Sequence, residues 1–235
     1  EIAFVGRRIK ETGLWPESIY IGGGTPTTRS AEQLDDLLQF VEDSIDLSRN
    51  IEFTVEAGRP DTITDEKLKA IKRHGADRIS INPQSMKKRT LELIGRSHEP
   101  GDIIKAFQAA HKVEIPVINA DVIAGLPEET PDDFAGTLES LLKLEPENIT
   151  VHTLAVKRAS RLVELDKDYH YKHAECVKEM LDISRNVLTE AGFRPYYLYR
   201  QKHMAGAMEN VGYCRDNTPC LYNIRIMEER QTILA

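Results

Sequence analysis

The pattern of apolar and polar positions along this chain alternates between strand-like runs and helix-like stretches. Short β-branched runs occupy residues 18–21, 51–55, 78–81, 117–123 and 149–154, and amphipathic stretches with helical spacing separate them. The runs recur at intervals of roughly 30 residues, the repeat of βα units in a parallel sheet. Apolar residues follow one another in these runs too continuously for an antiparallel sheet that has one face exposed to water. The pattern predicts an α/β fold, and it leaves open whether the sheet is doubly wound or closes as a barrel.

Helix boundaries in this pattern are marked by capping residues. Ser30, Thr64 and Thr130 each precede an amphipathic stretch, where a side-chain oxygen can accept a backbone N–H of the first turn. Gly75 and Gly192 follow the last apolar positions of two stretches and suit the left-handed conformation that ends helices. We therefore expect well-defined helices between the strands.

The C-terminal part of the chain has a different sequence pattern. A long helical pattern covers residues 169–191, a tyrosine-rich run follows at 196–199, and a polar loop leads to a short terminal run at 232–235. We interpret this region as one more βα-like element with an appendage. The sequence thus predicts a core over residues 1–165 and an extension over residues 166–235 within the same domain.

Composition narrows the class of protein. The 235 residues include 40% hydrophobic side chains, enough for one sizeable core. With a formal net charge of −7, the protein lacks the overall positive potential of a nucleic-acid binder, so we expect no nucleic-acid partner. No apolar run approaches the roughly 18 residues of a membrane span, so we expect no membrane partner. Three cysteines are too few for a disulfide framework, which favours a cytoplasmic location.

Candidate chemistry follows the strands, because loops after parallel strands form the active face of such folds. Three consecutive glycines, Gly22 to Gly24, follow the first strand and precede Thr25. They form either a plain tight turn or a backbone that a ligand can approach closely. The second strand ends in Glu56, which is either a solvated acid or a hydrogen-bond acceptor for an amine or a ribose hydroxyl.

The third and fourth strands carry two further candidates. Pro83 is expected to stop the third strand, so that Gln84 points into the mouth of the fold. Asp121 interrupts an apolar strand, where an unpaired carboxylate costs several kcal/mol and therefore needs a partner or a function.

Basic residues and metal ligands are the remaining possibilities. Lys157, Arg158 and Arg161 follow the fifth strand, and they suit either an acidic substrate or a solvated loop. Cys214 and Cys220 have no third cysteine nearby, and the His170–His173 spacing offers no third ligand. The sequence therefore predicts no metal site within the chain.

Taken in order, these motifs resemble a known family. The motifs lie at residues 22–26, 55–56, 78–85, 93–96 and 119–127. Together they resemble the radical S-adenosylmethionine enzymes of the oxygen-independent coproporphyrinogen III oxidase group. The segments 197–202, 209–213 and 221–223 resemble its coproporphyrinogen dehydrogenase branch.

The resemblance implies a partial (β/α)6 barrel that lacks its first strand. In the family, a Cys-x3-Cys-x2-Cys loop holds a [4Fe-4S] cluster, and here it would lie about 20 to 25 residues before Glu1. The chain opens within a helical pattern over residues 1–13 that has no start signal. We therefore expect a fragment of a longer protein, inactive by itself in radical chemistry.

The resemblance also assigns roles to individual residues. The glycine backbone would face the methionine end of S-adenosylmethionine, and Ala155 would leave room beside the adenine. The cofactor-binding positions that the resemblance implies are Gly23, Gly24, Thr25, Glu56, Gln84, Arg96, Asp121 and Ala155. In the family, some of these positions bind a second S-adenosylmethionine.

The implied function is the conversion of coproporphyrinogen III to protoporphyrinogen IX in porphyrin biosynthesis, with an electron donor and acceptor as partners. Lys157, Arg158, Arg161 and Arg200 are the cations that we expect to bind the substrate's carboxylates. The rival function is a haem-binding chaperone of the same barrel family, against which the segment 197–202 argues. The excess of acidic over basic residues argues against a radical enzyme that modifies nucleic acids.

Overall fold

A computed structural model describes residues 1–49, 52–155, 174–200, 208–229 and 231–234. The strands are β1 (Ser18–Ile21), β2 (Glu52–Ala57), β3 (Arg78–Gln84), β4 (Val117–Ala124), β5 (Asn148–Thr153), β6 (Arg194–Tyr199) and β7 (Asn210–Cys214). The α-helices are α1 (Ile2–Thr12), α2 (Ala31–Ser44), α3 (Asp65–Arg73), α4 (Lys88–Leu93), α5 (Pro100–Lys112), α6 (Pro131–Leu142), α9 (Ala174–Glu190) and α10 (Leu221–Glu228). Among the described helices, none combines the length and apolarity needed to cross a membrane.

The predicted caps are confirmed. The hydroxyl of Ser30 accepts the backbone N–H of Gln33 at 3.1 Å, and that of Thr130 accepts the N–H of Asp133 at 3.2 Å. Thr64 likewise accepts a first-turn N–H of α3. These bonds satisfy backbone donors that a helix start leaves open, so local sequence alone places the beginnings of α2, α3 and α6.

One sheet runs through the molecule in the order β1-β2-β3-β4-β5-β7-β6. β1 to β5 pair parallel, as expected from the βα repeat. β7 lies antiparallel between β5 and β6, so β6 runs in the same direction as β5. The helix α9 and the strand β6 thus form the further βα-like element that the sequence predicts, and β7 belongs to the appendage. Too few residues separate Tyr199 from Asn210 for a crossover helix, and a short connection allows an antiparallel neighbour.

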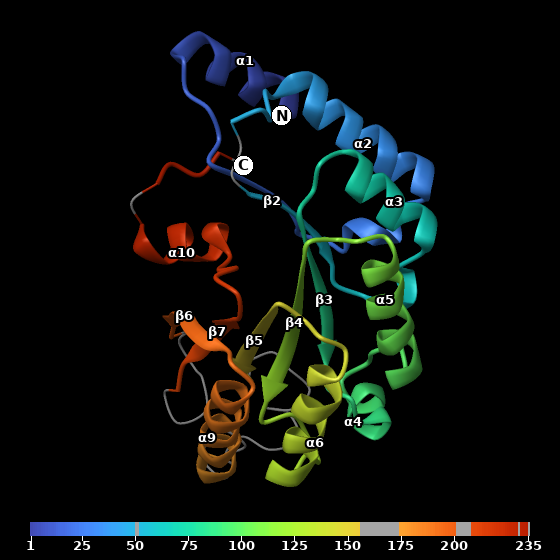
Figure 1. Cartoon of the computed structure of the whole chain (residues 1–235), viewed down its shortest axis with the longest axis vertical. Coiled ribbons are helices and arrows are strands. Elements are labelled where there is room, and N and C mark those ends of the chain that lie inside the picture. The colour runs from blue at the N-terminus through green and yellow to red at the C-terminus, as the bar shows by residue number, and fades with distance from the viewer. Residues whose placement is uncertain (50–51, 156–173, 201–207, 230, 235) are drawn as a thin grey trace.

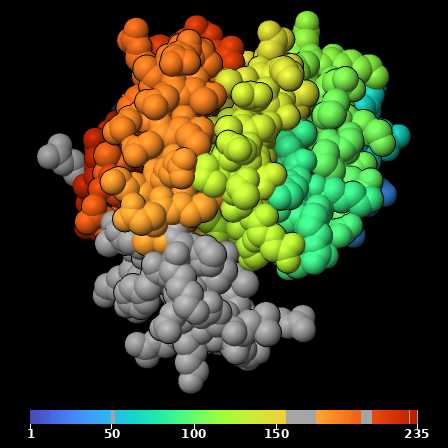
Figure 2. Space-filling view, turned by 90° about the horizontal axis from the view of Figure 1, so that it is seen from below, coloured from blue at the N-terminus to red at the C-terminus, as the bar shows by residue number. Residues whose placement is uncertain are grey.

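The sheet is curled, and helices cover its convex face (Figure 1). Figure 2 shows α9, α6 and the α4–α5 segment as successive bands on the outside of the molecule. In β2, Phe53 and Val55 are buried in the core, whereas Thr54 lines a cavity on the other face. The strands thus alternate between an apolar outer face and a polar inner face, which the sequence-based interpretation of continuous apolar runs missed. The barrel-like alternative is the correct one.

The helix α10 joins the two edges of this curled sheet. β1 and β6 are the edge strands, and α10 contacts both. The ring of Tyr222 stacks on that of Tyr20 with centroids 4.3 Å apart. The carboxylate of Glu52 accepts the first two N–H groups of α10, from Leu221 at 2.7 Å and from Tyr222 at 3.0 Å. A buried acid inside the sheet therefore caps the helix that closes it.

The predicted division into residues 1–165 and 166–235 stays a prediction, since its boundary lies outside the described residues. β6 and β7, from the proposed extension, nevertheless complete the same sheet as β1 to β5.

Candidate functional site

The glycine loop after β1 lies against the acid at the end of β2. A Cβ atom on Gly22 would lie 2.8 Å from Oε2 of Glu56 and would also collide with the ring of Tyr20. Gly23 has a φ of 102°, and a Cβ on Gly23 or Gly24 would meet no atom within 4 Å. The three glycines therefore differ: Gly22 permits close packing, whereas Gly23 and Gly24 expose backbone. Thr25, at the end of the loop, is half-buried.

Glu56 is a half-buried carboxylate with its own hydrogen-bond donors. Its donors are the backbone N–H of Gly23 and the amide of Asn82, whose Nδ2 lies 3.5 Å from Oε1. Burial raises the pKa of Glu56, the negative charge of Asp121 adds to the rise, and the two donors oppose it. The carboxylate therefore differs from a solvated acid at a strand end.

Arg96 brings a positive charge to the same region. Its guanidinium donates to the carbonyl of Gly58 at 3.4 Å, and it interacts with the charges of Asp121 and Glu56. Burial lowers the pKa of Arg96, and nearby Arg59 adds to this effect. The structure thus brings the guanidinium of Arg96 near two carboxylates, one of which, Glu56, contacts the exposed glycine loop.

Asp121 has the partners that its place in a strand requires. Its Oδ1 accepts the amide of Asn119 at 2.7 Å and lies 3.7 Å from Nε2 of His152. The same Asn119 amide donates to Ser80 at 2.8 Å, and its carbonyl accepts from Thr150 at 3.0 Å. Strands β3, β4 and β5 therefore fix this carboxylate through one polar network.

The expectation for Pro83 is wrong. β3 continues through the proline to Gln84, which pairs with Val122 after a shift of register. Gln84 is buried, and its φ of 68° is a left-handed conformation that costs a residue other than glycine free energy. A bulge accommodates the proline, because the bulged residue needs no ladder hydrogen bond.

The remaining predicted residues lie at or beyond the described region. Ala155 is half-buried just after β5. Lys157, Arg158 and Arg161 lie outside the described residues. Arg200 is exposed at the end of β6, where its guanidinium pairs with Glu209 at 2.7 Å.

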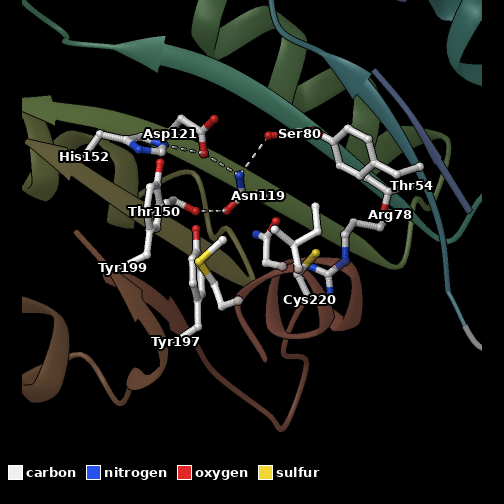
Figure 3. A pocket seen from close by; sticks show the side chains of 14 residues that line it. Thr54, Arg78, Ser80, Asn119, Asp121, Thr150, His152, Tyr197, Tyr199 and Cys220 are labelled. Atoms are coloured by element: carbon white, nitrogen blue, oxygen red, sulfur yellow. Dashed lines mark hydrogen bonds and ion pairs between the residues drawn. The ribbon is translucent and has the colours of Figure 1, made fainter. Parts of the chain in front are cut away.

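A cavity of about 300 Å³ lies inside the curled sheet (Figure 3). Of the predicted site residues that the structure describes, Asp121 alone lines it. The alternating polar positions in the strands were the signal that could have revealed the others. The lining is Tyr20, Thr54, Arg78, Ser80, Asn119, Asp121, Thr150, His152, Tyr197, Tyr199, Cys220, Asn223, Ile226 and Met227.

The described residues contain no group of three or more histidine, cysteine or acidic side chains that could hold a metal ion. Cys214 and Cys220 are buried, and burial raises the pKa of the Cys220 thiol to about 12. His170 and His173 lie outside the described residues.

Comparisons with known proteins agree with this geometry. Residues 3–141 match the family model described as the radical SAM superfamily. The chain is 44% identical over its full length to the oxygen-independent coproporphyrinogen-III oxidase-like protein HemZ of Bacillus subtilis, covering 47% of that protein. It is 32% identical to the heme chaperone HemW of the same organism over 77% of this chain and 48% of HemW.

The fold has a counterpart among solved structures. Coproporphyrinogen III oxidase, HemN, from Escherichia coli superimposes with a TM-score of 0.74 at 21% identity, over 97% of this chain and 49% of HemN. The chain thus spans about half the length of the relatives that it matches.

Proposed function

Since this chain belongs to the radical S-adenosylmethionine superfamily, we propose that its parent protein decarboxylates coproporphyrinogen III to protoporphyrinogen IX without oxygen. One observation carries the proposal. In a chain that is 44% identical over its full length to a coproporphyrinogen-III oxidase-like protein, Glu56 contacts the exposed glycine loop and interacts with the charges of Asp121 and Arg96.

The residues at the mouth of the sheet fit S-adenosylmethionine. Its methionine part carries an ammonium and a carboxylate, and its nucleoside carries two hydroxyls. Glu56 and Asp121 are acceptors for the ammonium or the hydroxyls, and Arg96 is a donor for the carboxylate. Gly23 and Gly24 leave space where any side chain would stand between ligand and backbone.

The residues of this chain would then bind and orient the reactants. When bound, S-adenosylmethionine and an iron–sulfur cluster supply hydrogen abstraction, as in the superfamily generally. Each of two propionate side chains would lose a hydrogen atom, one carbon dioxide and one electron, leaving a vinyl group, and the electron would pass to an acceptor protein. The described residues hold no ligand set for the cluster.

The second candidate function is haem binding without decarboxylation. The heme chaperones HemW of Bacillus subtilis and Escherichia coli, at 32% and 26% identity, support it. The two functions differ in what can be observed. A chaperone binds haem and releases no decarboxylated product, whereas the oxidase releases one.

One assay separates the two functions. The full-length protein, kept free of oxygen and supplied with S-adenosylmethionine, a reductant and an electron acceptor, receives coproporphyrinogen III. The proposal expects two carbon dioxide molecules for each protoporphyrinogen IX. Stoichiometric haem binding without any carbon dioxide release would establish the chaperone function in its place.

A further inference from the structure

The glycine loop and the loop after β2 are joined by a pair of threonine hydroxyls. The glycine loop continues into a short 3-10 helix, η1 (Pro26–Thr28), and β2 leads into another, η2 (Pro60–Thr62). The side-chain oxygens of Thr27 and Thr62 lie 2.7 Å apart. Because the Thr62 hydroxyl donates to the carbonyl of Arg59 at 2.7 Å, the hydroxyl of Thr27 is the donor in the bond between the two threonines. The two loops are thus bonded to each other beyond the glycines.

Lys67 links the same two loops through their backbone. Its ammonium donates to the carbonyl of Thr27 at 2.7 Å and to the carbonyl of Thr62 at 2.9 Å. Thr27 is fully buried and Lys67 is half-buried, and a hydrogen bond from a charged donor is stronger than one between neutral groups. One lysine therefore fixes the separation between η1 and η2.

The local rules of helix formation do not explain a lysine at this position. Lys67 is the third residue of α3, which begins at Asp65 after its cap, Thr64. The amino end of a helix carries partial positive charge, so acids stabilise the first turn and a cation does not. Asp65 and Glu66 follow this rule, whereas Lys67 departs from it. The bonds that Lys67 makes to the two loops account for its place.

The joined loops carry the groups that fit the cofactor. Gly23 and Gly24 expose their backbone, and Gly23 donates its N–H to Glu56 at the end of β2. Arg96 donates to the carbonyl of Gly58, which lies in the loop after β2. Glycine has more conformational freedom than any other residue, so a loop that is already held in place loses less entropy when a ligand binds.

We propose that Lys67 is a positioning residue for S-adenosylmethionine. By linking Thr27 to Thr62, it holds the exposed glycine backbone in register with Glu56 and Arg96, and it acts through the loops without contacting the ligand. This inference rests on the proposed function, because it assigns the glycine loop to the same cofactor. Glu56 and Arg96 suit the ammonium and the carboxylate of the methionine part, so the effect of Lys67 should fall on ligands that carry these groups.

The test compares two probes on the full-length protein, with affinities measured by calorimetry. S-adenosylhomocysteine keeps the ammonium and the carboxylate, whereas 5′-methylthioadenosine has the same nucleoside and a thioether without them. The variant is Lys67→Met. Melting temperatures are measured for every variant.

Lys72→Met is the matched control. Lys72 lies on the same helix, α3, and donates to the carbonyl of Glu114 at 2.6 Å. Glu114 precedes β4 at the amino ends of the parallel strands, whereas the glycine loop lies at their carboxyl ends. The control therefore removes a bond of the same kind away from the candidate site.

We expect Lys67→Met to weaken S-adenosylhomocysteine by about 10-fold, the scale of one charge-assisted hydrogen bond, and 5′-methylthioadenosine by less than about 3-fold. Lys72→Met should change neither affinity. Unchanged S-adenosylhomocysteine binding in Lys67→Met overturns the inference alone. Equal losses for the two probes also overturn it, because they indicate general damage to the site. A wild-type protein that binds neither probe overturns the proposed function as well.

A second variant, Thr27→Val, separates the position of the loop from the charge of the lysine. It removes the hydroxyl that bonds the glycine loop to Thr62 and leaves the ammonium of Lys67 in place. If both groups act through the loop, the double variant should lose less affinity for S-adenosylhomocysteine than the product of the two single losses. Losses that multiply would mean that Lys67 acts on the ligand by its charge, which overturns the positioning role.

Discussion

The carboxylate of Glu56 lies so close to Gly22 that a Cβ at Gly22 would stand 2.8 Å from its Oε2. The same Cβ would collide with the ring of Tyr20, which stacks on Tyr222 of the closing helix α10. The packing of one glycine thus connects the acid of the candidate cofactor site to the closure of the sheet.

Gly22→Ala should weaken S-adenosylmethionine binding to the full-length protein by at least about 10-fold, because Glu56 and Tyr20 must both move. Calorimetry measures the affinity. Gly136→Ala is the control, since a Cβ at this position of α6 meets no atom within 4 Å and the change should leave binding intact. Wild-type affinity in Gly22→Ala would show that Glu56 has no part in the site.

Glu56→Gln should stabilise the protein and weaken its binding of S-adenosylmethionine. Folding raises the pKa of Glu56 above its unfolded value near 4.5. Below that value the carboxyl is protonated in both states, so it costs no stability. As the pH rises through the folded pKa, ionisation of Glu56 lowers the free energy of unfolding. The variant should therefore melt at a higher temperature than wild type near pH 8 and at the same temperature near pH 4. Its S-adenosylmethionine affinity should fall by about 1–3 kcal/mol. A melting difference independent of pH would contradict this account.

Arg78→Met should detach the closing helix. Nε of Arg78 lies 3.4 Å from the carboxylate of Glu52, both side chains are buried, and Arg78 also donates to the carbonyls of Thr218 and Pro219. Removing one partner of a buried pair costs about 3–5 kcal/mol in the free energy of unfolding. Denaturant unfolding measures this cost, and hydrogen exchange should accelerate in residues 218–228.

The matched control for that change is Arg73→Met. It breaks an exposed pair with Asp35, 2.7 Å in length, and should cost only about 0–1 kcal/mol. Equal costs for the two variants would mean that the buried pair does not hold α10.

Two of the three cysteines, Cys176 and Cys220, should differ in reactivity. Burial and the neighbouring Glu52 raise the pKa of the Cys220 thiol to about 12, whereas Cys176 is only partly buried. Near pH 8 only about one Cys220 in 10,000 is a thiolate, the form that iodoacetamide attacks. Mass spectrometry should find Cys176 alkylated first and Cys220 unmodified until the protein is denatured. Early alkylation of Cys220 in the native protein would show that α10 opens readily.

The features that sequence alone predicted correctly depend on local or repeating patterns. Ser30, Thr64 and Thr130 cap their helices through atoms three residues away, so no tertiary information is needed. The βα repeat predicted five parallel strands, and their carboxyl ends bring Glu56 and the glycine loop together.

The missed features depend on contacts between distant segments. Thr54 and Thr150 alternate with apolar residues in their strands, which is a local signal of a polar face, but only the curvature of the sheet decides that this face encloses a cavity. His152 was missed for the same reason. The place of β7 could not be predicted either, since it inserts between two strands that precede it in the chain.

The most direct test of the proposed function follows the hydrogen atom. The full-length protein receives coproporphyrinogen III carrying deuterium on the propionate carbons next to the ring, together with S-adenosylmethionine and a reductant, without oxygen. The account predicts that 5′-deoxyadenosine gains one deuterium for each carbon dioxide released. Unlabelled 5′-deoxyadenosine, or none at all while the protein binds haem, would contradict it.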